Sequence, residues 1–147
     1  MNEDLNANLT ELLEIAAQEE ANWASRYQAL SDLVPEGETK DVLYTIYLDK
    51  VQNNRRMVDL LQKEIPNASS YTSPTPLFEK EETYTLENLK QYLQENIWHE
   101  VESARFYASI LPLFPDYSGT PQLTQLLEGA QNAAILNQYL FSLSFPG

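Results

Sequence analysis

Four long stretches of this chain carry apolar residues at alternating spacings of three and four positions, and clusters of proline and glycine separate them. This spacing places the apolar side chains on one face of an α-helix. Proline and glycine interrupt helices, so the clusters mark the connections. The predicted helices span residues 5–34, 39–65, 85–111 and 121–143. A chain of 147 residues is long enough to bury one core, so we expect a single all-α domain.

The lengths of the connections predict how the helices are arranged. The first and third connections are short and favour antiparallel neighbours, so each flanking pair of helices forms a hairpin. The second connection, residues 66–84, is rich in Ser, Thr and Pro and is long enough to run the length of a bundle as a crossover. A plain linker between independent hairpins is the alternative, but a lone hairpin could not bury its apolar face. We therefore predict an antiparallel four-helix bundle of two hairpins joined by a long crossover.

Composition excludes several classes of function. The chain contains no cysteine, which excludes disulfides, Cys-based zinc sites, iron–sulfur clusters and thiol nucleophiles. Its 22 acidic and 9 basic residues give a net charge of −13, which repels nucleic acid and anionic membranes. The first residues show no signal-peptide pattern, and no stretch is apolar enough for a membrane span. We expect a cytoplasmic protein without nucleic-acid or membrane partners, and a homo-oligomer such as a dimer stays possible.

The first and third predicted helices contain similar segments. Residues 20–27, EANWASRY, align with residues 100–107, EVESARFY, so that the first glutamates, the alanines at the fifth position and the final tyrosines coincide. Leu30 and Ile110 follow at the same distance in both helices. Such an ordered match indicates two related hairpins, although two helices could also have converged on one packing solution.

The two glutamates of this repeat, Glu20 and Glu100, occupy positions that the apolar spacing assigns to the core, midway along each helix. An isolated buried carboxylate is costly, so it must be paired, bind a cation or take up a proton. Two facing carboxylates cannot both stay ionised without a positive partner. We therefore expect both side chains to point inward and to share a compensating group.

A Glu followed seven positions later by a Tyr in two helices, within two hairpins joined by a long crossover, resembles the ferritin-like superfamily. The resemblance is strongest to rubrerythrin-type and bacterial ferritin-like domains and covers essentially the whole chain. In that family one Glu from each of the first and third helices, and a Glu-x-x-His motif from each of the other two, bind two iron ions. The resemblance thus implies that Glu20 and Glu100 match two of the metal ligands.

The other ligand positions depart from the family pattern. The second-helix motif falls at residues 53–56, Asn-Asn-Arg-Arg, and the fourth-helix motif at residues 134–137, Ala-Ile-Leu-Asn. Neither contains Glu or His, so four of the six expected ligands are missing. The single histidine, His99, lies about 100° around the helix from its neighbour Glu100 and cannot replace a motif histidine. We predict a degenerate di-iron site and no cofactor, with iron or another divalent metal as the alternative.

Three arrangements could compensate the two glutamates. In the first, Arg55 or Arg56, with core asparagines such as Asn53, does electrostatically what the metal ions do in the family. In the second, both arginines face solvent, and the glutamates share a proton or reach ordered water. In the third, the glutamates form a weak, oxygen-rich metal site with Asp49 or Glu102. The candidate polar site of the core comprises Glu20, Glu100, Asn53, Arg56, Tyr27 and Tyr107.

Aromatic and small residues complete the predicted core. Trp23, Tyr27 and Tyr107 lie on the core stripes, where aromatic side chains usually pack, so we interpret them as core rather than as electron relays. Residues 130, 133 and 134 are all alanine, and a small apolar pocket could form there, where larger ligand side chains would otherwise stand.

Two classes of function remain. In the first, a structural or interaction protein keeps the ferritin-like bundle without its oxidase chemistry, which agrees with the missing ligands. In the second, a metal-binding oxidoreductase or iron-handling protein keeps a divergent carboxylate site, because folds of this type are commonly metal enzymes. Function must be argued from the site and not from the fold. The incomplete ligand set leads us to predict the non-catalytic role.

Overall fold

The computed structural model describes residues 3–65, 71–77, 84–114 and 119–146. Four α-helices account for most of these residues, and they span α1 (Glu3–Leu33), α2 (Glu38–Glu64), α3 (Leu89–Ile110) and α4 (Thr120–Ser144). Two short 3₁₀ segments, η2 (Leu86–Asn88) and η3 (Leu111–Leu113), precede and follow α3. The described ranges contain no β-strand, and none of their helices is both long and apolar enough to cross a membrane.

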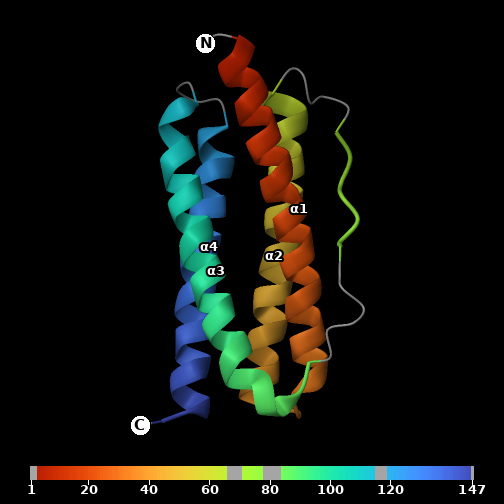
Figure 1. Ribbon diagram of the computed structural model, residues 1–147, viewed down its shortest axis with the longest axis vertical. Helices are drawn as coiled ribbons and strands as arrows, with labels where there is room; N and C mark the ends of the chain where they lie inside the picture. Colours follow the sequence, from red (N-terminus) through yellow and green to blue (C-terminus); the bar gives the residue numbers. More distant parts are fainter. Residues whose placement is uncertain (1–2, 66–70, 78–83, 115–118, 147) are drawn as a thin grey trace.

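The helices form two hairpins that pack side by side (Figure 1). The most extensive contacts join α1 to α2 and α3 to α4, and contacts between α2 and α4 connect the hairpins. The predicted all-α fold, a four-helix bundle of two hairpins, is confirmed. α3 begins at Leu89 rather than at residue 85, because residues 86–88 form the tighter turn η2.

Part of the connection between the hairpins runs along α1 (Figure 1). The side chain of Gln18 donates to the carbonyl oxygen of Thr75 at 2.9 Å, and the backbone N–H of Leu77 donates to Asn22 Oδ1 at 2.7 Å. These contacts fasten residues 71–77 to the outside of the first hairpin. The other parts of the predicted crossover, residues 66–70 and 78–83, lie outside the described residues.

A glycine determines how α4 begins beside α2. Gly119 precedes α4 with φ of 72°, a conformation that side-chain-bearing residues adopt at a cost. A Cβ atom at this position would lie 2.7 Å from Leu60 Cδ1 and 2.8 Å from Phe114 Cδ1. Both the backbone conformation and the close approach therefore require glycine here.

The core consists of two apolar clusters. One contains Leu13, Leu60 and Leu123, and the other contains Leu30, Leu43 and Leu93. In each of the first three helices, buried polar side chains lie in sequence between the residues that the helix contributes to the two clusters. The bundle thus contains a buried polar layer midway along its length.

Candidate functional site

The polar layer draws one or two side chains from each helix. Its members are at most 2% exposed, and they are Glu20 from α1, Lys50 and Asn53 from α2, Asn96 and Glu100 from α3, and Asn137 from α4. Each follows the three-and-four spacing of the apolar residues around it, so helix geometry directs it inward with them. The layer is therefore a consequence of the same periodicity that builds the core.

Lys50 lies between the two glutamates. Its Nζ is 2.6 Å from Glu100 Oε2 and 3.5 Å from Glu20 Oε2. The two carboxylates thus converge on one ammonium group. Because all three side chains are buried, this ion triad has little screening by water, and its charges interact strongly.

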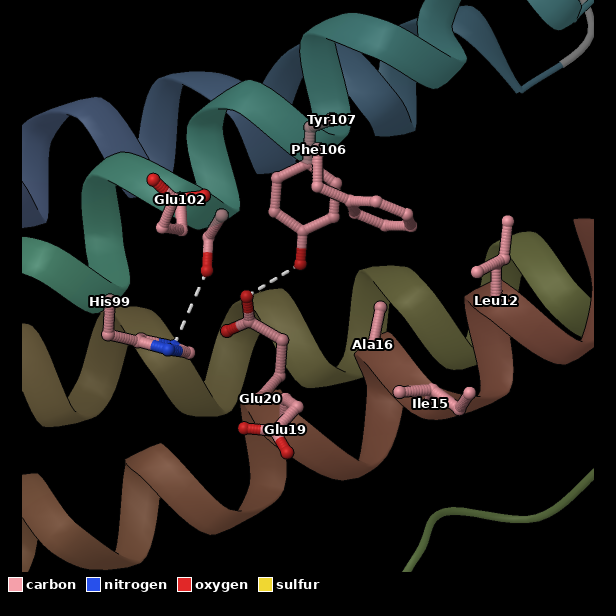
Figure 2. A pocket seen from close by; sticks show the side chains of 10 residues that line it. Leu12, Ile15, Ala16, Glu19, Glu20, His99, Glu102, Phe106 and Tyr107 are labelled. Atoms are coloured by element: carbon pink, nitrogen blue, oxygen red, sulfur yellow. Dashed lines mark hydrogen bonds between the residues drawn. The ribbon is translucent and has the colours of Figure 1, made fainter.

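The two repeat tyrosines lie against the glutamates of the opposite hairpin. Tyr107 donates its hydroxyl to Glu20 Oε1 at 2.6 Å (Figure 2). Tyr27 is the corresponding neighbour of Glu100: burial raises the pKa of the Tyr27 hydroxyl, and the nearby charge of Glu100 raises that pKa further. Each tyrosine therefore lies near the glutamate of the other hairpin, so the Glu and Tyr of the two similar segments meet across the bundle.

An amide network joins Tyr27 to the surface. Asn137 Nδ2 donates to the Tyr27 hydroxyl at 2.8 Å, and Asn96 Nδ2 donates to Asn137 Oδ1 at 3.1 Å. Arg26 then donates from Nε to Asn96 Oδ1 at 2.9 Å and pairs with Glu95 at 2.7 Å. The chain of donors gives each amide a fixed orientation, because reversing one would place two donors or two acceptors together.

Burial and the neighbouring charges shift the pKa values of Lys50 and Glu100. Two carboxylates and one ammonium leave one net negative charge when all three groups are ionised. Burial raises the pKa of Glu100 from 4.5 to about 7, although the ammonium of Lys50 acts in the opposite direction. Burial alone would lower the pKa of Lys50, but the charges of Glu20 and Glu100 outweigh it and raise that pKa. Lys50 therefore remains a cation, and Glu100 takes up a proton near neutral pH.

The tyrosines stay neutral for a related reason. Burial and the nearby carboxylate charges raise the pKa of both Tyr27 and Tyr107 well above 10. Both hydroxyls therefore stay protonated, and that of Tyr107 donates its proton to Glu20. Both residues are buried in the core, as the sequence predicted, whereas Trp23 is only partly buried.

His99 lies at the edge of this site and is uncharged. Its ring stacks on Trp23 with centroids 3.8 Å apart and planes 5° from parallel, and its Nε2 is 3.8 Å from Glu100 Oε1. Burial, assisted by the positive charges of Lys50 and Arg26, lowers the pKa of His99 to about 3. His99 therefore contributes no positive charge to the carboxylates at neutral pH.

The predicted role of the arginines is wrong. Arg55 is exposed, and Arg56 donates to Asn53 Oδ1 at 2.8 Å rather than to either glutamate. The compensating cation is Lys50, which was not among the candidate site residues predicted from the sequence. The signal was present, because residues 43, 46, 50, 53, 57 and 60 follow the three-and-four spacing without a break. A lysine is normally assigned to the surface, and only its place in this series marked it as buried.

Asn53 has a specific neighbour on α4. A Cβ atom at Gly129 would lie 2.5 Å from Asn53 Nδ2, so glycine leaves the room that the amide occupies. Asn53 therefore lies at the contact between α2 and α4, within the polar layer but hydrogen-bonded to Arg56 rather than to the triad.

The residues around Glu20 and Glu100 do not fit a metal centre. Asp49 and Glu102, the two further ligands considered from sequence, are exposed, and the described residues contain no group of three His, Asp or Glu side chains able to bind a metal ion. The ammonium of Lys50 lies between the two carboxylates, where a metal would need their oxygens. Ala130, Ala133 and Ala134, where the sequence suggested a small apolar pocket, are all buried.

Tyr107→Phe should lower the free energy of unfolding by about 1.5–3 kcal/mol, because it leaves a buried charged acceptor without its donor. Tyr139→Phe is the matched control, since Tyr139 donates to Glu38 at the surface and its loss should change stability by less than about 0.5 kcal/mol. Urea denaturation followed by circular dichroism measures both. Equal losses in the two variants would contradict the role given to Tyr107.

Comparison of the chain with protein-family models, with curated proteins and with solved structures gives no match.

Proposed function

We propose that this protein is a ferritin-like bundle that has lost the di-iron site and acts without catalysis, as a structural or interaction protein. The observation that carries the proposal is the position of Lys50, whose ammonium lies between Glu20 and Glu100. One fixed cation at this position does what two metal ions do in the family that the sequence resembles. The bundle can then be stable with no metal bound.

The chemistry of the surrounding side chains supports this proposal. Metal ions of the iron type favour carboxylate and imidazole ligands. The groups nearest to the glutamates are instead the hydroxyl of Tyr107 and the ammonium of Lys50, each at 2.6 Å, and the single imidazole nearby, that of His99, is 3.8 Å from Glu100. A divalent cation entering the triad would have to displace a buried, ion-paired ammonium. Separating that ammonium from its carboxylates leaves an uncompensated buried charge, which is strongly destabilising.

Protein purified without chelator should contain far less than one equivalent of metal, and it should not oxidise Fe(II) in air faster than buffer does. The measurements are elemental analysis and optical Fe(II) titration on the unaltered chain and on a Glu20→Gln/Glu100→Gln variant. An Asp59→Asn/Glu128→Gln variant is the control, because it removes the same charge from exposed positions outside the candidate site. Stoichiometric metal that is lost in the first variant and kept in the second would instead support a metal-binding oxidoreductase or iron-handling protein.

A further inference from the structure

Lys50 and Glu100 meet in a buried contact that joins the two hairpins. Lys50 belongs to α2 and Glu100 to α3, and neither side chain is more than 1% exposed. The nitrogen Nζ of Lys50 lies 2.6 Å from Glu100 Oε2. The carboxyl carbon Cδ is one bond of about 1.2–1.3 Å beyond that oxygen, so it lies within about 3.9 Å of the nitrogen. Reacting atoms are placed for attack at separations of about 3–3.5 Å, so a small movement brings nitrogen and carbon into position.

The contact is close, but it is not aligned as a hydrogen bond. Lys50 Nζ and both carboxyl oxygens of Glu100 have no hydrogen-bond partner among the described residues. A buried ion pair without good hydrogen bonds does not recover the free energy that its two groups lose on leaving water. A reaction that replaces both groups with one neutral group is therefore favoured at this position.

Glu20 places a second carboxylate beside the same nitrogen. Its Oε2 is 3.5 Å from Lys50 Nζ, and its Oε1 accepts the hydroxyl proton of Tyr107 at 2.6 Å. This hydrogen bond holds the carboxylate in place within the core. The site thus combines a nitrogen nucleophile, a carboxyl electrophile and a proton acceptor, which are the groups that formation of an amide requires.

We propose that Lys50 and Glu100 condense to an amide that links the two hairpins covalently. The ammonium of Lys50 passes one proton to the carboxylate of Glu20, and the freed lone pair attacks Cδ of the protonated Glu100 carboxyl. The Nζ–Cδ bond forms, the bond from Cδ to the hydroxyl oxygen breaks, and the hydroxyl leaves as water with a second proton from the nitrogen. One ammonium, one carboxylate and one carboxylic acid become an amide, a carboxylic acid and water, so no charge stays buried.

The reaction should be slow, because the two carboxylates stabilise the ammonium form of Lys50 and the amine form is rare. Freshly purified protein should therefore contain the ion triad, and the amide should accumulate as the protein ages. The amide would fix α2 to α3 by a bond within the core, in addition to the chain that connects the hairpins. This inference concerns a covalent modification and does not depend on the proposed non-catalytic role.

The test is the intact mass of the full chain, measured by mass spectrometry during prolonged incubation at neutral pH below the unfolding temperature. A species lighter by one water should accumulate, and its protease digest should contain a cross-linked peptide pair that joins Lys50 to Glu100. A mass that stays at the value given by the sequence would overturn the proposal. A loss of water that the digest places at other residues would also overturn it.

Three variants test the part played by each carboxyl group. Glu100→Gln presents a carboxamide to the same nitrogen, so its product should be lighter by one ammonia instead of one water. Glu20→Gln keeps the size of the side chain but removes the proton acceptor, and it should slow the change in mass at least about tenfold. Glu102→Gln, at an exposed position of α3, is the matched control and should react like the unaltered chain. Loss of water from Glu100→Gln, or an unchanged rate in Glu20→Gln, would refute the proposed reaction.

Discussion

Replacing Lys50 with methionine should lower the free energy of unfolding at neutral pH by about 3–5 kcal/mol, because it leaves two buried carboxylates without their cation. Methionine is close to lysine in length and adds no polar group, so the packing of α2 changes little. Urea denaturation followed by circular dichroism gives the difference directly. The loss should shrink in acid, because protonated carboxyl groups no longer repel each other.

A triple variant separates lost charge from lost packing. Lys50→Met combined with Glu20→Gln and Glu100→Gln removes all three charges together, and it should recover much of the stability lost in the single variant. Lys63→Met is the matched control, since Lys63 is exposed near the end of the same helix and should matter by less than about 0.5 kcal/mol. Similar losses in the Lys50 and Lys63 variants would show that Lys50 does not compensate the glutamates.

The pH dependence of stability should reverse in sign between two single variants. The pKa of Glu100 is raised by burial from 4.5 to about 7, so its stabilising contribution is complete below pH 4.5 and is lost as pH rises toward 7. The pKa of His99 is lowered by burial from 6.5 to about 3, so its contribution is complete above pH 6.5 and is lost as pH falls toward 3. Between pH 4.5 and 6.5 the two contributions oppose each other, and the unaltered protein should show little change from this pair.

Two single variants, Glu100→Gln and His99→Gln, each remove one of these opposing contributions to stability. Glu100→Gln should become more stable as pH rises from about 5 to about 6, and His99→Gln should become less stable over the same range. Their opposite slopes should differ by roughly 2–3 kcal/mol across that unit of pH, since each full proton contributes about 1.4 kcal/mol per unit. Urea denaturation of both variants at each pH measures the slopes. If stability changed with pH in the same direction in both variants, the opposite pKa shifts of Glu100 and His99 would be wrong.

The two similar segments, residues 20–27 and 100–107, place their glutamates and tyrosines opposite each other across the bundle. Tyr107 donates to Glu20, and Lys50 lies 2.6 Å from Glu100, so each glutamate has a partner from the other hairpin. The two hairpins therefore depend on each other for their buried charges as well as for their apolar faces. The sequence shows which residues recur, but a comparison of two segments does not reveal that their partners are exchanged.

Much of the fold follows from the sequence alone. Apolar spacing, proline clusters and connection lengths identify four helices in two hairpins, because helix periodicity and helix interruption are local properties of the chain. The same periodicity placed Glu20, Glu100, Tyr27 and Tyr107 in the core, where the structure has them. It also contained the signal for Lys50, which lies in the apolar series of α2.

The tertiary structure decided which groups meet within that core. Arg56 and Lys50 both lie on α2, and only the rotation of that helix against α1, α3 and α4 determines that the lysine reaches the glutamates while the arginine reaches Asn53. Likewise, α2 and α4 are in contact, whereas α1 and α3 leave a cavity between them that is lined by residues such as Leu12, Glu20 and Phe106. Local periodicity determines which face of a helix is buried. The partners of a buried charge depend on how whole helices pack, and that is a property of the assembled bundle.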